Sequence, residues 1–457
     1  TMLDRLDPLI RGLRYGLLLF FYTWAVVWFG VRAAERPDIK RSAADRLAVS
    51  ARRSVTTMAK VVRGSQREHL EKRLQDNDQH YAIGELGGVD GLDERLYLLH
   101  YRYLGGDLGK VLLQCIKTGE VAKEWRVPLP RVFDDLVALK KKLATGFREG
   151  RVPVDQASGV AKSPAAISIL APMISDDMGL LFHVMPAGHL YQIDADSRFV
   201  WRSDEITHHS LERDADGNLW TCAMNYEHPL AVRDRYREEA ALCLTPDGER
   251  VAMHSLTDML QQSGLLEEML YATPSFYKDG LGSDPFHMND VQPALTDGAY
   301  WKRGDLFLSL RHKSAVIQYR PSVEKIVFHQ QGPWLAQHDI TLGSDDTFTL
   351  FNNNTRLVTN TLSDAGSSLA KFDFATNKTV MIGMGEFATR YQGRQVPLDN
   401  GQTLVESTGA GGYVLLDPSG ATICRFFVPF YSNAENAMAP CWSRLYLKTA
   451  DGFEQQG

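Results

Sequence analysis

LYQIDADSRFVWR, residues 190–202, decides how the chain folds. It contains two short apolar runs, and the Asp-, Ala- and Ser-containing stretch between them is typical of a tight turn. Two such runs joined by a turn predict a β-hairpin. Five further copies of the pattern occur: VLLQCIKTGEVAKEW from Val111, ALCLTPDGERVAM from Ala241, VIQYRPSVEKIVF from Val316, LAKFDFATNKTVMI from Leu369 and YVLLDPSGATICRF from Tyr413.

A second turn precedes each copy and opens another hairpin. Its residues are Asp90-Gly91, Asp177-Met178-Gly179, Asp216-Gly217-Asn218, Arg303-Gly304-Asp305, Asp345-Asp346 and Asp399-Asn400-Gly401. Each unit is therefore a meander of about four strands, and such units closed in a ring bury both faces of every sheet. A β-sandwich would not repeat one hairpin six times. We therefore predict an all-β, six-bladed β-propeller over residues 86–457.

One insertion interrupts the repeat near residues 229–284. Within it, SLTDMLQQSGLLEEMLYA from Ser255 has leucines and methionines at helical spacing, and we expect it to pack at the edge of the propeller.

The N-terminal part of the chain has a different character. Residues 15–31 read YGLLLFFYTWAVVWFGV, 17 residues without a charge, which is just long enough to cross a hydrocarbon core. Arginines flank this run on both sides. A cleaved signal peptide would need an A-x-A-like site, which does not follow, and a buried core helix is the other alternative. We predict a membrane anchor over residues 1–36 and a basic helical linker over residues 37–85.

Composition adds little to these predictions. The net charge of −6 on 457 residues gives no indication of nucleic-acid binding. The five cysteines form no C-x-x-C pair and leave the redox compartment open. The charges around the apolar run do not fix its orientation in a membrane.

Three histidines recur at one place in the repeat. His209 lies seven residues before Asp216, His338 lies seven before Asp345, and His287 lies ten before Asp297. We expect the inner strands of blades three, four and five to bring these imidazoles together near one mouth of the central channel. Arg311, which follows the inner strands of blade four, is expected to point into the same space.

The chemistry of these side chains favours a tetrahedral oxyanion as ligand. Arginine presents a planar fork of donors that matches such an anion, and an unprotonated imidazole is a nucleophile. Histidine clusters also bind zinc or copper, and single histidines are often structural. No carboxylate pair that would complete a metal site stands out beside them.

At these residues the chain resembles the PAPS-independent arylsulfotransferase family. The stretches that carry the resemblance are ITHHSLERDADGNLW, DPFHMNDVQPALTDG, LFLSLRHKSAVIQY, QHDITLGSDDTFTLFNN and NGQTLVESTGAGGYVLLDPSG, within residues 175–430. The family's members are propellers that move a sulfuryl group from an aryl sulfate to a phenol through a sulfated histidine, without an external cofactor.

The resemblance implies a role for each residue of the site. His338 takes the place of the nucleophile, and Arg311 that of the oxyanion clamp. His287 matches a histidine that binds the sulfuryl group and protonates the leaving phenol. His209 matches the first histidine of the set, with His208 as a substitute, and Asn289 is placed to orient His287.

The chain departs from the family pattern in two places. Residues 327–336 read VFHQQGPWLA where a W-x-L-G-G run is frequent, and Ser210 follows His209 where an Asp is common. Four aromatic residues are expected to flank the site and to stack on an aryl ring, although packing between blades is the alternative for each. They are Phe286, Trp334, Tyr226 and Phe351.

We therefore expect a single-pass protein of the cytoplasmic membrane. The resemblance places its propeller in the periplasm, with an aryl sulfate and a phenol as its small-molecule partners. The alternative is a non-catalytic propeller subunit of a membrane protein complex, docked through its N-terminal helix. A metal-binding propeller is a third hypothesis.

Overall fold

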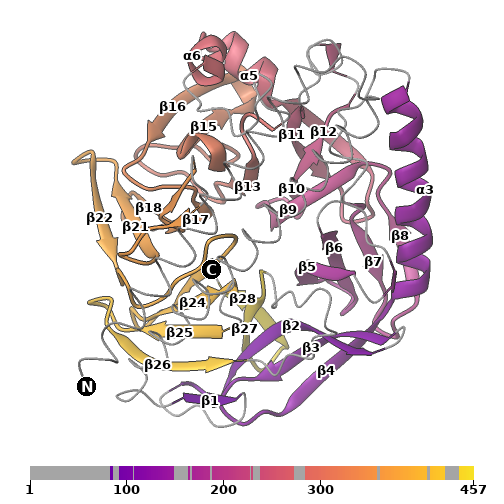
Figure 1. Cartoon of the computed structure of the whole chain (residues 1–457). Helices are drawn as coiled ribbons and strands as arrows, with labels where there is room; N and C mark the ends of the chain where they lie inside the picture. Colours follow the sequence, from indigo (N-terminus) through magenta and orange to yellow (C-terminus); the bar gives the residue numbers. More distant parts are fainter. Residues whose placement is uncertain are drawn as a thin grey trace, which may run out of the picture. The chain divides into compact units, whose positions relative to one another are not determined.

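Six β-sheets of four or five strands surround a common centre in the part of the chain that the structure describes (Figure 1). The structure is a computed structural model that describes residues 83–85, 92–105, 108–148, 163–164, 167–185, 188–226, 228–229, 237–271, 284–357, 361–408, 412–427 and 442–456. The chain divides into two compact units, Thr1–Gln79 and His80–Gly457. The predicted anchor, and the predicted linker up to residue 82, lie outside the described residues. Among the described helices, none combines the length and the apolar character that crossing a membrane requires.

Each sheet is one blade, and in blades 2 to 5 the strands run in sequence order from the centre outward. Blade 2 has β5 (Ser168–Ile174), β6 (Leu180–Met185), β7 (Tyr191–Ile193) and β8 (Phe199–Arg202). Blade 3 has β9 (Ile206–Arg213), β10 (Leu219–Met224), β11 (Glu239–Leu244) and β12 (Arg250–Ser255). Blade 4 has β13 (Met288–Pro293), β14 (Leu306–Leu310), β15 (Ala315–Arg320) and β16 (Lys325–Gln331). Blade 5 has β17 (His338–Leu342), β18 (Thr347–Asn352), β21 (Ser368–Asp373) and β22 (Lys378–Ile382). Between β18 and β21 in the sequence, β19 (Thr355–Arg356) and β20 (Thr361–Leu362) form a separate short pair.

The remaining two blades contain the ends of the described chain. Blade 6 has β23 (Arg394–Pro397), β24 (Thr403–Ser407), β25 (Gly412–Leu416) and β26 (Thr422–Phe427), and β1 (Ile83–Glu85) pairs with β26 in parallel. Blade 1 has β28 (Phe453–Gln456), β27 (Arg444–Lys448), β2 (Leu96–Gly105), β3 (Leu108–Cys115) and β4 (Val121–Pro128). Because β27 pairs with β2, a strand from the C-terminal end closes the ring.

These sheets confirm the six-bladed propeller. Every copy of the repeated pattern forms an antiparallel pair on the outer side of one blade, from β3 and β4 to β25 and β26, and in blade 6 β1 is added outside this pair. Five of the preceding turns join the two inner strands, and left-handed backbone angles occur there at Met178, Gly217, Gly304, Asp346 and Gly401. The Asp90-Gly91 turn lies outside the described residues.

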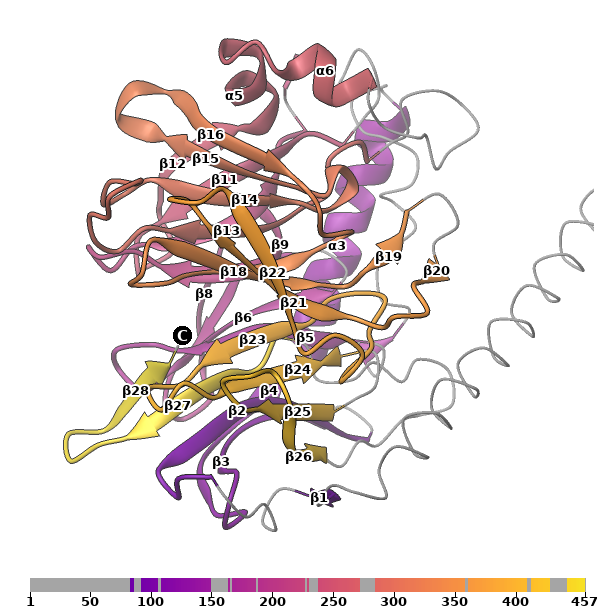
Figure 2. The ribbon, with the colours of Figure 1, turned by 90° about the vertical axis from the view of Figure 1, so that its left-hand side faces the viewer.

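Helices cover parts of the outer rim (Figures 1 and 2). The predicted helical insertion forms α5 (Leu256–Gln262) and α6 (Leu266–Tyr271), and α5 contacts β11, β12 and β16. Ser255 caps α5 by accepting a hydrogen bond from the Asp258 amide. We did not predict α3 (Leu129–Arg148), whose buried residues follow the three- and four-residue spacing of an amphipathic helix. They are Leu129, Val132, Leu136, Leu139 and Leu143.

The inner strands of neighbouring blades are joined by side chains that accept backbone hydrogen bonds. Val291 donates its amide to Ser210 Oγ (2.9 Å), Ile340 to Asp290 Oδ2 (2.6 Å), and Gln395 to Asp339 Oδ2 (2.7 Å). Each acceptor stands at a β-bulge, where the ladder of β9, β13 or β17 shifts its register. We call these three contacts the inner brackets, because each one fixes the next blade beside the previous one.

Buried charges from several blades meet beside the inner brackets. Glu212 pairs with Arg444 (3.2 Å) and Arg394 (3.4 Å), and Arg394 also lies 3.5 Å from Asp339. Burial raises the pKa of Asp339 to about 7. Burial, together with Asp339 and Glu212, raises the pKa of Asp290 well above its usual value, which favours its neutral form.

The inner bracket at Asp290 predicts a difference between two substitutions. Asp290→Asn keeps an oxygen for the Ile340 amide and imitates a neutral acid, so we expect it to be tolerated. Asp290→Ala leaves that buried amide without its acceptor and is expected to cost about 1–3 kcal/mol more. Urea unfolding of both variants measures the difference, and equal stabilities would contradict the role of the bracket.

Candidate functional site

The three repeated histidines meet in one cluster. The ring of His209 lies 5.1 Å from that of His287 and 6.2 Å from that of His338, measured between centroids. His209 comes from the bulge of β9, His287 directly precedes β13, and His338 begins β17. His209 and His287 are partly exposed whereas His338 is almost fully buried. The sequence-predicted convergence from blades 3, 4 and 5 is therefore present.

Arg311 lies against this cluster. It begins the short 3-10 turn η4 (Arg311–Lys313) after β14, and its amide donates to the His287 carbonyl (3.0 Å). Its side chain is buried, and Nη2 has no hydrogen-bond partner among the described residues. The Arg311 charge helps to lower the pKa of both His287 and His338, after the larger effect of burial. A buried guanidinium with free donors beside imidazoles suits an anionic ligand.

The hydrogen bond of His338 fixes its tautomer. Its Nδ1 lies 2.6 Å from Asn353 Oδ1. The amide nitrogen of Asn353 donates to the carbonyls of Thr389 (3.1 Å) and Gln392 (2.6 Å), so its oxygen faces His338 as an acceptor. His338 Nδ1 must then carry the proton, and Nε2 keeps its lone pair. A neutral imidazole in this tautomer is a nucleophile at Nε2.

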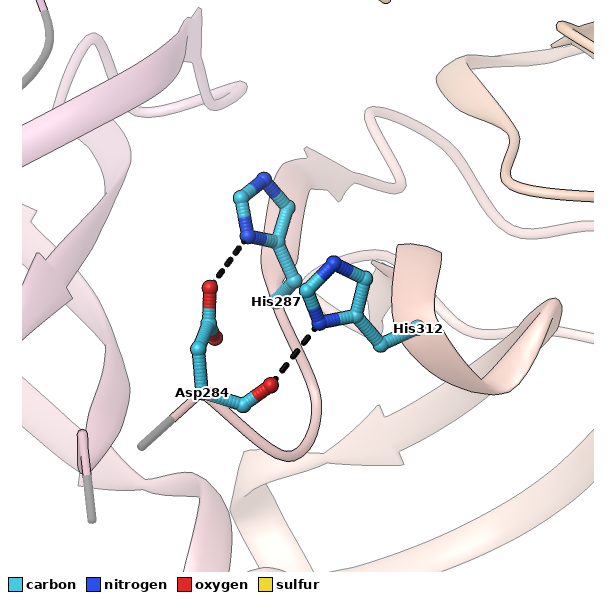
Figure 3. A group of neighbouring side chains, drawn as sticks. All are labelled: Asp284, His287 and His312. Carbon is cyan, nitrogen blue, oxygen red and sulfur yellow. Dashed lines mark hydrogen bonds and ion pairs between the residues drawn. The ribbon is translucent and has the colours of Figure 1, made fainter. Parts of the chain in front are cut away.

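Asp284 orients two histidines at once (Figure 3). Its carboxylate lies 2.5 Å from His287 Nδ1, and its backbone carbonyl lies 2.8 Å from His312 Nδ1. Burial raises the pKa of the Asp284 carboxyl, but His287 and Arg237 outweigh burial and bring it well below its usual value. Asp284 is therefore an ionised acceptor that directs His287 Nε2 away from itself.

His208 does not replace His209 but supports it. It is fully buried, and its Nδ1 lies 2.8 Å from His209 Nδ1. One of these two nitrogens must donate and the other accept, so the two rings share one hydrogen. Asn289 is buried at the bulge of β13 and donates to the Gln337 carbonyl (2.8 Å) rather than to His287. It therefore joins blade 4 to the residue before His338.

The aromatic residues expected at the site lie in hydrophobic cores. Phe286 belongs to the core that blades 3 and 4 share, and Trp334 packs on Phe348 with ring centroids 5.7 Å apart. Phe351 is fully buried as well, and Tyr226 packs against the core of blades 1 and 2. Protein covers Phe286, Trp334 and Phe351, and Tyr226 is half-buried against a core. Packing therefore explains their positions, and the structure does not support the expected stacking on an aryl ring.

Sequence reasoning missed several residues of the cluster. Tyr391 is 47% exposed and lies 5.4 Å from the Arg311 guanidinium, measured to the ring centroid. Asp284 and His312 stand inside the DPFH and SLRH stretches, where the spacing to His287 and Arg311 could have drawn attention to them. Asn353 and Tyr391 follow no pattern in the repeat.

A metal ion is the competing ligand for part of this cluster. Asp284, His287 and His312 offer ligand atoms within 4.8 Å of one another. Asp284 and His287 are already hydrogen-bonded to each other, and Arg237 lies 3.4 Å from the Asp284 carboxylate. The neighbouring Arg311 adds a second positive charge. This electrostatic environment favours an anion over a cation.

Comparison with solved structures finds propeller-sized matches at low identity. A protein of unknown function from Bacteroides caccae has 11% identity and a TM-score of 0.44 over 76% of this chain and 97% of its own. A streptogramin B lyase has 12% identity and a TM-score of 0.35 over 63% and 82%. A virginiamycin B lyase from Staphylococcus aureus has 11% identity and a TM-score of 0.35 over 64% and 84%. No curated protein matches the chain.

A family model gives a clearer result. The model described as Arylsulfotransferase (ASST) matches residues 183–426, which is more than half of the 457 residues. The match runs from blade 2 to blade 6 and includes His208, His209, His287, His312 and His338. Since it spans both the repeated blades and every histidine of the cluster, the chain belongs to the arylsulfotransferase (ASST) family.

Proposed function

We propose that the chain transfers a sulfuryl group from an aryl sulfate to a phenol through a sulfohistidine at His338. The observation that carries the proposal is the tautomer of His338, which leaves a lone pair on Nε2 beside the free donors of Arg311. Family membership supports the reaction class.

In the first half-reaction, His338 Nε2 attacks the sulfur of the aryl sulfate. The bond between sulfur and the aryl oxygen breaks, and its electron pair leaves on that oxygen, which takes a proton from an imidazole of the site. The family resemblance gives this proton transfer to His287. The product phenol then departs and the sulfuryl group stays on His338.

In the second half-reaction, the oxygen of the acceptor phenol attacks the same sulfur. Its proton passes to the imidazole that gave one up, the nitrogen–sulfur bond breaks, and its electron pair returns to Nε2. No external cofactor takes part. Arg311 stabilises the sulfuryl oxygens, on which charge develops in both steps.

Tyr391 replaces the buried aromatics as the surface for an aryl ring. It is an exposed aromatic residue beside Arg311, and an accessible aromatic side chain is what contact with an aryl substrate needs. We retain the predicted membrane anchor over residues 1–36 and the periplasmic placement of the propeller as part of this proposal. A non-catalytic subunit of a membrane complex remains the rival function.

The first test follows the His338 tautomer. Purified protein is given 4-nitrophenyl sulfate and phenol, and sulfuryl transfer and a sulfated His338 peptide are measured by mass spectrometry. We expect His338→Ala to abolish both. Asn353→Ala is expected to lower the rate about 10²-fold, because His338 loses the acceptor that orients it.

Asn354→Ala is the matched control, because Asn354 is the next residue and bonds to the Gly366 carbonyl instead. It should transfer at the normal rate. Absence of transfer by the unmodified protein would favour the subunit function. Full activity of His338→Ala would exclude His338 as the nucleophile.

The second test concerns the Arg311 clamp. Arg311→Ala removes preorganised donors from the sulfuryl oxygens, and such a loss typically costs about 2.7–4 kcal/mol in the transition state. We expect kcat to fall about 10²–10³-fold. Arg311→Lys keeps the positive charge but loses the planar fork of donors. Its kcat should lie between those of the unmodified protein and Arg311→Ala. Arg303→Ala is the control, because Arg303 is exposed. An unaffected kcat in Arg311→Ala would contradict the clamp.

The third test concerns pH. Burial and then Arg311 lower the pKa of His338 well below its usual value of 6.5. The neutral nucleophile therefore persists as pH falls through 6.5 and is lost only at lower pH. We expect the acid limb of kcat/KM for sulfohistidine formation to lie well below 6.5, and Arg311→Ala to move that limb upward. A limb at the ordinary histidine value would contradict this assignment.

A further inference from the structure

Two buried polar atoms face each other behind the histidine cluster. His208 Nε2 and Glu239 Oε1 are 3.8 Å apart, and both side chains are completely buried. His208 Nε2 has no hydrogen-bond partner among the described residues, and Glu239 Oε1 has an ion-pair contact with Arg237 Nη2 at 3.2 Å. An unsatisfied buried nitrogen is costly, so its position opposite a buried carboxyl group calls for a functional reason.

These two atoms continue a row of neighbouring polar groups that begins at His209 in the site. His209 Nδ1 lies 2.8 Å from His208 Nδ1, and His208 Nε2 faces Glu239. The imidazole of His208 therefore stands between His209 and a buried carboxyl group. Both nitrogens of His208 are used in this row, one toward each neighbour.

Two donors near Glu239 stabilise its carboxylate form, whereas burial stabilises its protonated form. The Met288 amide donates to its Oε2 (2.5 Å), and Arg237 Nη2 lies 3.2 Å from its Oε1. Burial raises the pKa of Glu239 to about 8, and Asp284 adds to this while Arg237 opposes it. The neighbouring Glu238 bonds to Ser255 and Thr257 instead and has no part in the row.

We propose that Glu239, His208 and His209 form a proton relay that serves the phenolic oxygen of the substrate. This inference rests on the proposed function and moves its acid–base step from His287, where the family resemblance puts it, to His209. Neutral His287 gives its Nδ1 hydrogen to Asp284 and has no hydrogen at Nε2. Neutral His209 has one there when His208 donates to its Nδ1.

The proton moves in three linked transfers during the first half-reaction. His209 Nε2–H passes its proton to the departing phenolate oxygen, and His208 Nδ1–H passes one to His209 Nδ1. Glu239 Oε1–H passes one to His208 Nε2 once these two atoms move from 3.8 Å to hydrogen-bond distance. Glu239 ends as a carboxylate opposite Arg237, and both imidazoles stay neutral. The second half-reaction reverses every transfer, so a full cycle consumes no solvent proton.

The test compares two aryl sulfates on the full chain. Phenyl sulfate has a poor leaving group that needs a proton, whereas 4-nitrophenyl sulfate leaves readily as a phenolate. In Glu239→Gln, we expect sulfohistidine formation from phenyl sulfate to slow by about 10²-fold, the usual contribution of a positioned acid. Formation from 4-nitrophenyl sulfate should change little.

Glu238→Gln makes the same chemical change one residue away and should keep the ratio of the two rates. If Glu239→Gln slows both substrates equally, or neither, the relay is overturned. If the unmodified protein forms sulfohistidine from neither substrate, the proposed function fails and the relay with it.

A measurement on the unmodified protein keeps the test open if Glu239→Gln does not fold. The rate with phenyl sulfate is followed in mixtures of light and heavy water. A curved dependence on the deuterium fraction means that several protons move in the transition state, as the relay requires. A linear dependence means that one proton moves and overturns the relay.

Discussion

Among the described strands, those of neighbouring blades share no β-ladder at the centre of the propeller, so the inner strands need other acceptors for their backbone amides. The inner brackets supply them, with Ser210, Asp290 and Asp339 each accepting an amide of the next blade. Two of the acceptors directly follow a histidine of the site, because His209 precedes Ser210 and His338 precedes Asp339. The contact that spaces the blades therefore also fixes the backbone that carries the histidines. The spacing of blades 3 to 6 and the geometry of the site are therefore one constraint.

This constraint explains one departure from the family pattern. Ser210 stands where an Asp is common, yet its hydroxyl accepts the Val291 amide as Asp290 and Asp339 accept theirs. The bracket needs an acceptor and not a charge. A third carboxyl here would join Asp290 and Glu212 in a buried region where burial already raises the pKa of Asp290. A neutral acceptor avoids that repulsion while it keeps the spacing of the blades.

The sequence predicts what is local and repeated. Short apolar runs and turn residues are local signals that predict the blades, and the helical spacing of leucines and methionines predicts α5 and α6. The histidines could be found because their register repeats. Burial is not local, so Phe286 and Trp334 could not be told from exposed rings. Asn353 and Tyr391 reach the cluster only through the packing of blades 5 and 6, and no spacing in the chain indicates it.

The charges around the cluster determine which ligand it suits. Asp284 and Glu239 are the acids nearest to the histidines, and Arg237 lies between them, 3.4 Å from one and 3.2 Å from the other. Arg311 faces the histidines with donors that no described residue uses. Asp284 is ionised and paired with Arg237, and burial favours the neutral form of Glu239. The positive charge of Arg311 is therefore left without compensation at the cluster. A monoanionic sulfate ester supplies that compensation, whereas a divalent metal ion would add to the excess.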